Sequence, residues 1–182
     1  MTDETPKPDA ASAAQPGDGK AQAAERPGLP PIQITAQYVK DLSFENPNAP
    51  KSLQGGQPPP QVSVNVDVRT NQLEDKTYEV VLHIKGEAKS GDIQSFIVEL
   101  SYAGVVTLGN VAKEHTAPAL LIEAPRLLFP FARAVIADAT RDGGFPPMMV
   151  QPIDFVELFR RQVETLRSRQ GAAAEAPAAA NS

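Results

Sequence analysis

The sequence contains no cysteine and no tryptophan, and it has only 2 histidines among its 182 residues. Without cysteine there is no disulfide framework, no thiolate metal site and no cysteine nucleophile. His83 and His115 are not spaced as metal ligands, and neither lies in a nucleophile motif such as Gly-x-Ser-x-Gly. We therefore expect no metal site, no cofactor and no catalytic residue, and we do not expect an enzyme.

Long apolar runs and clustered positive charge are also missing. No stretch of about 18 apolar residues is present, so no membrane insertion is expected. The acidic start at Asp3 and Glu4 lacks the apolar segment of a secretory signal. The net charge is −5, and phosphate binding needs a clustered basic face, so a nucleic-acid partner is not expected. Together these absences fit a cytoplasmic protein.

Large apolar side chains are scarce at both ends of the chain. Residues 1–31 and 170–182 consist mostly of alanine, proline, glycine and polar residues. Such segments cannot bury enough apolar surface to offset an ordering entropy of about 1–2 kcal/mol per residue. We predict two disordered tails around one folded domain at 32–169. Gly171 and Pro177 argue against a helix in the C-terminal tail.

Between the tails, the first pattern is an alternation of apolar and polar residues. In segment 32–45 the even positions are apolar except Lys40, so Asp41 and Glu45 fall on the opposite face. Prolines then divert the chain into a long loop at 46–60. Similar alternation at 61–70, 78–88 and 93–108 predicts three more strands. Four such strands indicate an antiparallel sheet with one buried and one solvated face.

The residues expected on the buried face share this period of two. They are Ile32, Ile34, Ala36, Tyr38, Leu42 and Phe44 in the first strand, Val62, Val64, Val66 and Val68 in the second, Tyr78, Val80, Leu82 and Ile84 in the third, and Phe96, Val98, Leu100, Tyr102 and Val106 in the fourth.

After residue 110 the pattern becomes helical. A helix is predicted over 117–144, with a break or kink at Pro125 and Pro130 and a stop signal at 141–144. A second helix is predicted over 154–170, because Phe155, Phe159, Val163 and Leu166 form an apolar stripe. The predicted fold class is α+β, a four-stranded antiparallel sheet with two helices packed on one face.

The part of the first helix at 127–140 is apolar nearly all round, since only Arg133 and Asp138 are charged. A helix of this kind is buried on nearly all sides, and one sheet covers only one of them. We therefore predict a subunit interface through Phe131, Val135 and Ile136. The alternative is that the last helix packs over this one within a single subunit.

Four segments in this order resemble the SecB family of bacterial export chaperones, over about residues 32–166. They are KDLSFENPNAP (40–50), YEVVL (78–82), LLFPFAR (127–133) and GGFPPMMVQPIDFVELF (143–159). The resemblance implies a SecB-like dimer of dimers, a homotetramer. It also implies a chaperone that binds unfolded preproteins in the cytoplasm without ATP and delivers them to the motor SecA.

The resemblance also implies two binding sites. SecA would dock on the exposed face of the sheet through Asp41, Glu45, Ile97 and Glu99. The loop at 46–60 would be a crossover loop that borders a client groove, and we assign this groove Tyr38, Phe44 and Leu53. Without the resemblance, the outward carboxylates would be ordinary solubilising residues. Two alternatives stay open: a SecB-like chaperone or scaffold dedicated to one partner, as in a toxin–antitoxin system, and a hydrolase without a recognisable motif.

Overall fold

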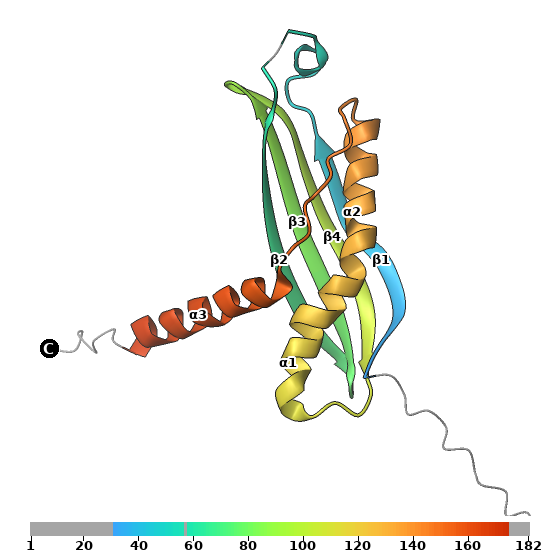
Figure 1. The fold of residues 1–182 in the computed structure, drawn as a ribbon, viewed down its shortest axis with the longest axis vertical. Helices are drawn as coiled ribbons and strands as arrows, with labels where there is room; N and C mark the ends of the chain where they lie inside the picture. Colours follow the sequence, from blue (N-terminus) through green and yellow to red (C-terminus); the bar gives the residue numbers. More distant parts are fainter. Residues whose placement is uncertain (1–30, 57, 175–182) are drawn as a thin grey trace, which may run out of the picture.

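A four-stranded antiparallel sheet forms the body of the protein (Figure 1). The computed structural model describes residues 31–56 and 58–174. The strands are β1 (Ile32–Glu45), β2 (Gln61–Glu74), β3 (Thr77–Ser90) and β4 (Ile93–Leu108), in the spatial order β1-β4-β3-β2. The chain therefore crosses from one edge of the sheet to the other between β1 and β2. The short helix η1 (Lys51–Leu53) lies in this crossover.

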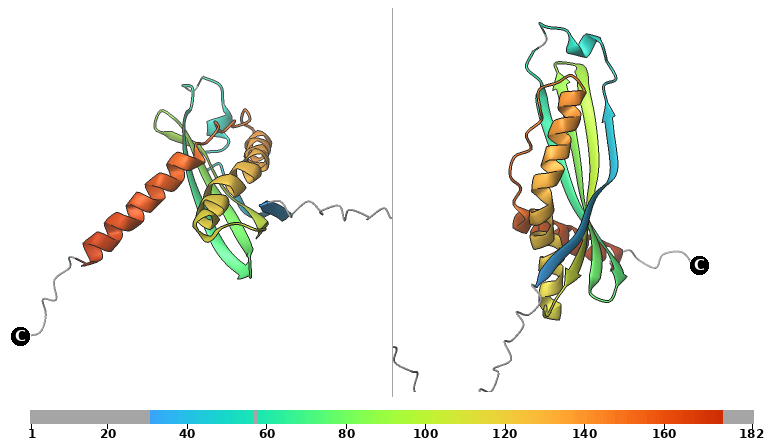
Figure 2. Two further views of the ribbon diagram at one scale, coloured as in Figure 1. Left: turned by 60° about the horizontal axis from the view of Figure 1, so that its bottom comes forward. Right: turned by 90° about the vertical axis from the view of Figure 1, so that its right-hand side faces the viewer.

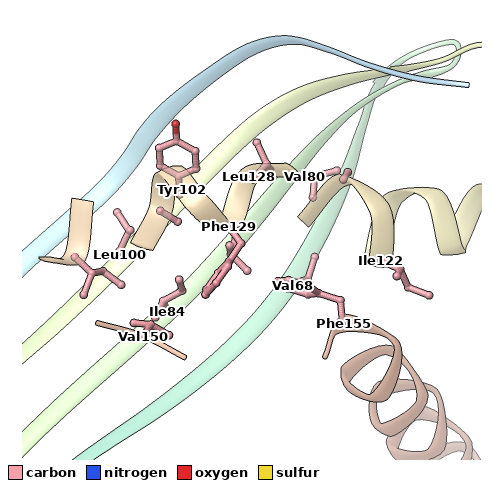
Figure 3. Packing of buried hydrophobic residues seen from close by; sticks show 14 of the residues in the cluster. Val68, Val80, Ile84, Leu100, Tyr102, Ile122, Leu128, Phe129, Val150 and Phe155 are labelled. Atoms are coloured by element: carbon pink, nitrogen blue, oxygen red, sulfur yellow. The ribbon is translucent and has the colours of Figure 1, made fainter. Parts of the chain in front are cut away.

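The inner face of the sheet carries the core, as the alternation predicted for β3 and β4. Val80, Leu82 and Ile84 of β3 are buried, and so are Val98 and Leu100 of β4. Figure 3 shows Val80, Ile84 and Leu100 together with Leu128 and Phe129 of the helix that covers the sheet. In β2 the inward valines Val66 and Val68 are at least partly buried, whereas Val62 and Val64 are half exposed because the helix lies mainly over β4 and β3.

The covering helix is built from several consecutive pieces. After η2 (Lys113–His115), the segments α1 (Thr116–Pro118), the π-helical turn η3 (Ala119–Glu123) and α2 (Ala124–Asp142) follow without interruption. Pro125 is the second residue of α2 and follows directly on the π-helical turn, so the helical hydrogen-bond pattern changes where proline cannot donate a backbone N–H. Pro130 lies inside α2 and does not end it. The predicted stop is confirmed, since α2 ends before Gly143 and Gly144.

Helix α2 has two faces of different character. Its inner side includes Ile136, which is 0% exposed in the core of the same chain. The prediction that Ile136 contributes to a subunit interface is therefore wrong. Val135 is partly buried against the core, whereas Phe131 is 52% exposed. The exposed apolar side chains form a stripe on the side away from the sheet, made of Leu127, Pro130, Phe131 and Ala134.

The last helix, α3 (Phe155–Ala174), points away from the sheet and from α2 (Figures 1 and 2). Its first turn anchors it, because Phe155 is buried with its ring 6.0 Å from that of Phe129. Further along, Gln162 Nε2 donates to Asp67 Oδ1 at 2.8 Å. The alternative in which the last helix covers α2 within one subunit is therefore wrong.

The described helix α3 also continues beyond the predicted end of the folded domain. It runs to Ala174, past the predicted domain end at residue 169, and Gly171 does not end the helix. The remaining parts of the two predicted tails, 1–30 and 175–182, lie outside the described residues. The fold class itself is confirmed, with the qualification that only α2 lies along the sheet.

Candidate functional site

The register of β1 and β4 brings the four predicted docking residues together on the outer face of the sheet. Glu45 lies opposite Ile97, and Ser43 lies opposite Glu99. Asp41 lies two residues before Ser43 on β1, opposite Ser101. Residues directly opposite each other in an antiparallel pair share one face. Asp41, Glu45 and Glu99 are exposed and Ile97 is partly so, which confirms that these side chains face outward.

Strand β1 contains two bulges, and they change which face Tyr38 occupies. The register shifts between Ile34 and Ala36 and again between Val39 and Asp41. Because each bulge inserts one residue, the alternation is inverted between them and restored after the second. Tyr38 therefore lies opposite Ala103 on the outer face. The prediction that Tyr38 shares the inner face with Phe44 is wrong.

On the outer face Tyr38 takes part in a network around Glu79 of β3. The Tyr38 hydroxyl donates to Glu79 Oε1 at 2.5 Å, and Lys40 Nζ lies 2.9 Å from Oε1 and 2.8 Å from Oε2. The hydrogen bonds from Lys40 and then Tyr38 lower the pKa of Glu79. The hydrogen bond to Glu79 in turn raises the pKa of Tyr38. This network joins β1 to β3 across the intervening β4.

Strand β3 places two further charged residues, Lys85 and Glu87, beside the four predicted docking residues. Glu87 lies opposite Ile97, and Lys85 lies opposite Glu99. Lys85 Nζ is 2.8 Å from Glu99 Oε1 and 3.3 Å from Glu87 Oε1. These bonds, the one to Glu99 above all, raise the pKa of Lys85. The outward positions in the third predicted strand were a sufficient signal to find both residues.

The same face continues beyond the carboxylates to His83. The Nδ1 atom of His83 lies 2.9 Å from Ser101 Oγ. Burial lowers the pKa of His83 most, and the positive charge of Arg69 lowers it further. Within residues 31–56 and 58–174, no group of three or more His, Cys, Asp or Glu side chains is placed to hold a metal ion.

The two remaining predicted groove residues both lie near the C-terminal end of α2. Phe44 stacks on Phe96 with ring centroids 5.7 Å apart, and Phe145 lies 6.4 Å from Phe44. Phe44 also packs directly on Gly143. Leu53 of the crossover loop lies against the neighbouring Gly144 and stays half exposed. The structure thus brings Phe44 and Leu53 to one region and places Tyr38 on the other side of the sheet.

Comparison with known proteins identifies the family. Residues 25–166 match the family described as preprotein translocase subunit SecB. The chain belongs to the SecB family. The protein-export protein SecB of Bradyrhizobium sp. (strain BTAi1) is 53% identical over 143 residues, 79% of this chain and 88% of that protein. The SecB of Rhodospirillum centenum is 51% identical over 164 residues, 90% of this chain and 93% of that protein.

A solved structure has the same fold. It is the Mycobacterium tuberculosis SecB-like chaperone in complex with a peptide of the HigA1 antitoxin. The match has a TM-score of 0.56 and 12% identity, and it covers 67% of this chain and 90% of the other. This likeness supports the SecB fold alone, whereas the close sequence relatives identify the chain as a protein-export chaperone. None of the helices in the described part of the chain is both long and apolar enough to cross a membrane.

Proposed function

We propose that this SecB-family chain holds unfolded preproteins in the cytoplasm and delivers them to SecA, without nucleotide and without catalysis of its own. The observation that supports the delivery step is the register of β1 and β4, which gathers Asp41, Glu45, Ile97 and Glu99 on one exposed face. Three carboxylates around a partly exposed isoleucine suit a basic partner surface that also carries an apolar side chain.

The docking proposal predicts a salt-dependent loss of binding when the charges on β1 are removed. Asp41→Asn combined with Glu45→Gln should weaken the complex with SecA, most strongly at low salt, where screening is least. Both side chains are exposed, so the free energy of unfolding should change by less than about 0.5 kcal/mol. Titration calorimetry against SecA measures the effect.

An unfolded client protein serves as the control in the same experiment. Its affinity for the double variant should be unchanged, because Phe44 of the proposed client groove lies on the inner face of the sheet and the carboxylates lie on the outer face. Unchanged SecA affinity would mean that the two carboxylates only keep the surface soluble.

For client binding, we propose the region around Phe44 and Leu53, which lie against the neighbouring Gly143 and Gly144. Phe44 is partly buried and Leu53 half exposed, so an extended apolar segment of a client can contact the rim formed by the crossover loop.

For assembly, we propose a homotetramer that covers the exposed stripe of α2, since contiguous exposed apolar surface marks interaction sites.

A chaperone dedicated to one partner is the second candidate function, because a SecB-like chaperone bound to an antitoxin peptide shares the fold. Sequence identities near one half with protein-export proteins favour the export role. The deciding measurement is the aggregation of several unrelated refolding proteins with and without this chain, in the absence of ATP. General suppression supports the export role, whereas suppression confined to one client or dependent on ATP contradicts it.

A further inference from the structure

Lys85 lies between two carboxylates, Glu99 and Glu87, on the proposed docking face. In the row formed by paired strands, Ser43, Glu99 and Lys85 are neighbours, and the adjacent row holds Glu45, Ile97 and Glu87. Lys85 Nζ bonds to the carboxylates of both Glu99 and Glu87. Glu99 and Glu87 are thus already paired with Lys85 within the chain. Glu45 is exposed and does not take part in these two ion pairs.

A hollow lies beside this ion pair on the same face. Its volume is about 210 Å³, and the residues that line it include Asp41, Glu99 and Lys85. Asp41 and Glu99 approach it from β1 and β4, and Lys85 approaches it from β3. Asp67 and Arg69 of β2 also line the hollow and pair with each other at 3.0 Å, so it is bordered by three carboxylates and two cationic side chains.

We propose that Lys85 is a built-in competitor for the docking partner: a cationic side chain of the partner replaces Lys85 at Glu99 and occupies the hollow between Asp41 and Glu99. This inference rests on the proposed docking of SecA to the same face. It adds that Lys85 holds the affinity below what the carboxylates alone would support, and that the partner group in this position is a lysine or arginine.

The exposure of the ion pair makes the exchange feasible. Glu99 is 49% exposed and Lys85 45% exposed, and exposed ion pairs are worth little because water solvates both partners. A partner can therefore displace Lys85 at small cost, while the positive charge of Lys85 still repels an approaching cation. A lysine that instead oriented Glu99 for docking would strengthen the complex with SecA. The two roles predict opposite signs.

Lys85→Gln distinguishes the two roles by the direction in which the affinity for SecA changes. If Lys85 competes, the variant binds SecA more tightly at low salt by roughly threefold, the Coulomb interaction of two unit charges about 6 Å apart in water. The salt dependence of binding becomes steeper, because the face gains net negative charge. Lys85→Arg keeps the charge and should bind SecA as the wild type does. Calorimetric titrations with SecA at several salt concentrations measure both quantities.

Lys113→Gln is the matched control, because Lys113 is exposed in η2, outside the sheet. It removes the same charge and should leave SecA affinity unchanged. Unchanged or weaker binding by Lys85→Gln overturns the inference. If Asp41→Asn with Glu45→Gln still weakens binding in that case, the docking face stands and only the role of Lys85 is wrong. If that double variant has no effect either, the docking face itself is wrong and the inference falls with it.

Discussion

The carboxylate of Glu79 is nearly buried although it lies on the outer, solvated side of the sheet. The residue is 8% exposed, and it is covered by Tyr38 and Lys40, which reach it from two strands away. Burying a charge is costly unless it is paired and hydrogen-bonded, and both conditions are met here. The alternation of apolar and polar residues does not predict this network, because Tyr38 faces outward only between the two bulges of β1.

Glu79→Gln is expected to lower the free energy of unfolding by about 1–3 kcal/mol at neutral pH, since it removes hydrogen bonds to a charged group. The folded-state pKa of Glu79 is lowered, so its contribution is present above the ordinary pKa of glutamate and is lost as the pH falls through the lower, folded value. Urea denaturation at neutral and acidic pH should therefore show a difference from wild type that shrinks on acidification.

Glu99→Gln is the control for this effect, because it is the same substitution on the same face in an exposed ion pair. Its cost should be less than about 1 kcal/mol. Equal losses for the two variants, or a Glu79→Gln deficit that grows at acidic pH, would contradict the proposed role of the network.

Among the elements, β1 shows most clearly where prediction from sequence succeeds and fails. The alternation correctly placed Asp41, Glu45 and Phe44, because two bulges restore the original phase beyond Lys40. Between the bulges the phase is inverted, and a pair of compensating bulges leaves almost no trace in a period of two. The trace that did remain was Lys40, the one charged residue at an even position, and it stands at the second bulge.

Helix α2 comes close to β4 at a glycine. A Cβ atom on Gly104 would lie 2.7 Å from Leu128 Cδ2, closer than packed atoms approach. Leu128 is fully buried, so it cannot rotate into solvent. Gly104→Ala should therefore push α2 from the sheet and lower the free energy of unfolding by about 1–3 kcal/mol. Chemical denaturation measures the loss.

A double-mutant cycle separates this overlap from a general intolerance of the strand. Leu128→Ala alone should cost about 2–5 kcal/mol, and Gly104→Ala with Leu128→Ala should cost less than the sum of the single variants. Gly55→Ala in the crossover loop meets nothing within 4 Å and should be nearly neutral. Strict additivity at positions 104 and 128 would contradict the proposed contact.

At the scale of the whole molecule, the sequence predicted that α2 is covered on two sides but not which residues face each side. An all-apolar surface carries no periodicity to orient it, so Ile136 and Phe131 were indistinguishable. The structure separates them, with Ile136 in the core and Phe131 on the exposed stripe. The Lys85 pairs were out of reach for a different reason, since cross-strand partners depend on a register that one sequence does not state.

The exposed stripe of α2 leads to the last prediction. A homotetramer would have a mass of roughly four times the 19.4 kDa of one chain. Phe131→Asp should split it into smaller species, because an unpaired charge buried in an interface costs several kcal/mol. Phe131 is half exposed in the single chain, so the subunit itself should stay folded. Light scattering with circular dichroism measures mass and folding together.

Leu53→Asp is the matched control, since Leu53 is exposed to a similar extent but lies in the crossover loop. That variant should keep the wild-type mass and bind unfolded clients less tightly, because it places a charge at the proposed groove. A wild-type protein that is a monomer at micromolar concentration would refute the tetramer. A Phe131→Asp protein that keeps the wild-type mass would move the interface away from α2, and the stripe of Leu127, Pro130, Phe131 and Ala134 would then need another partner.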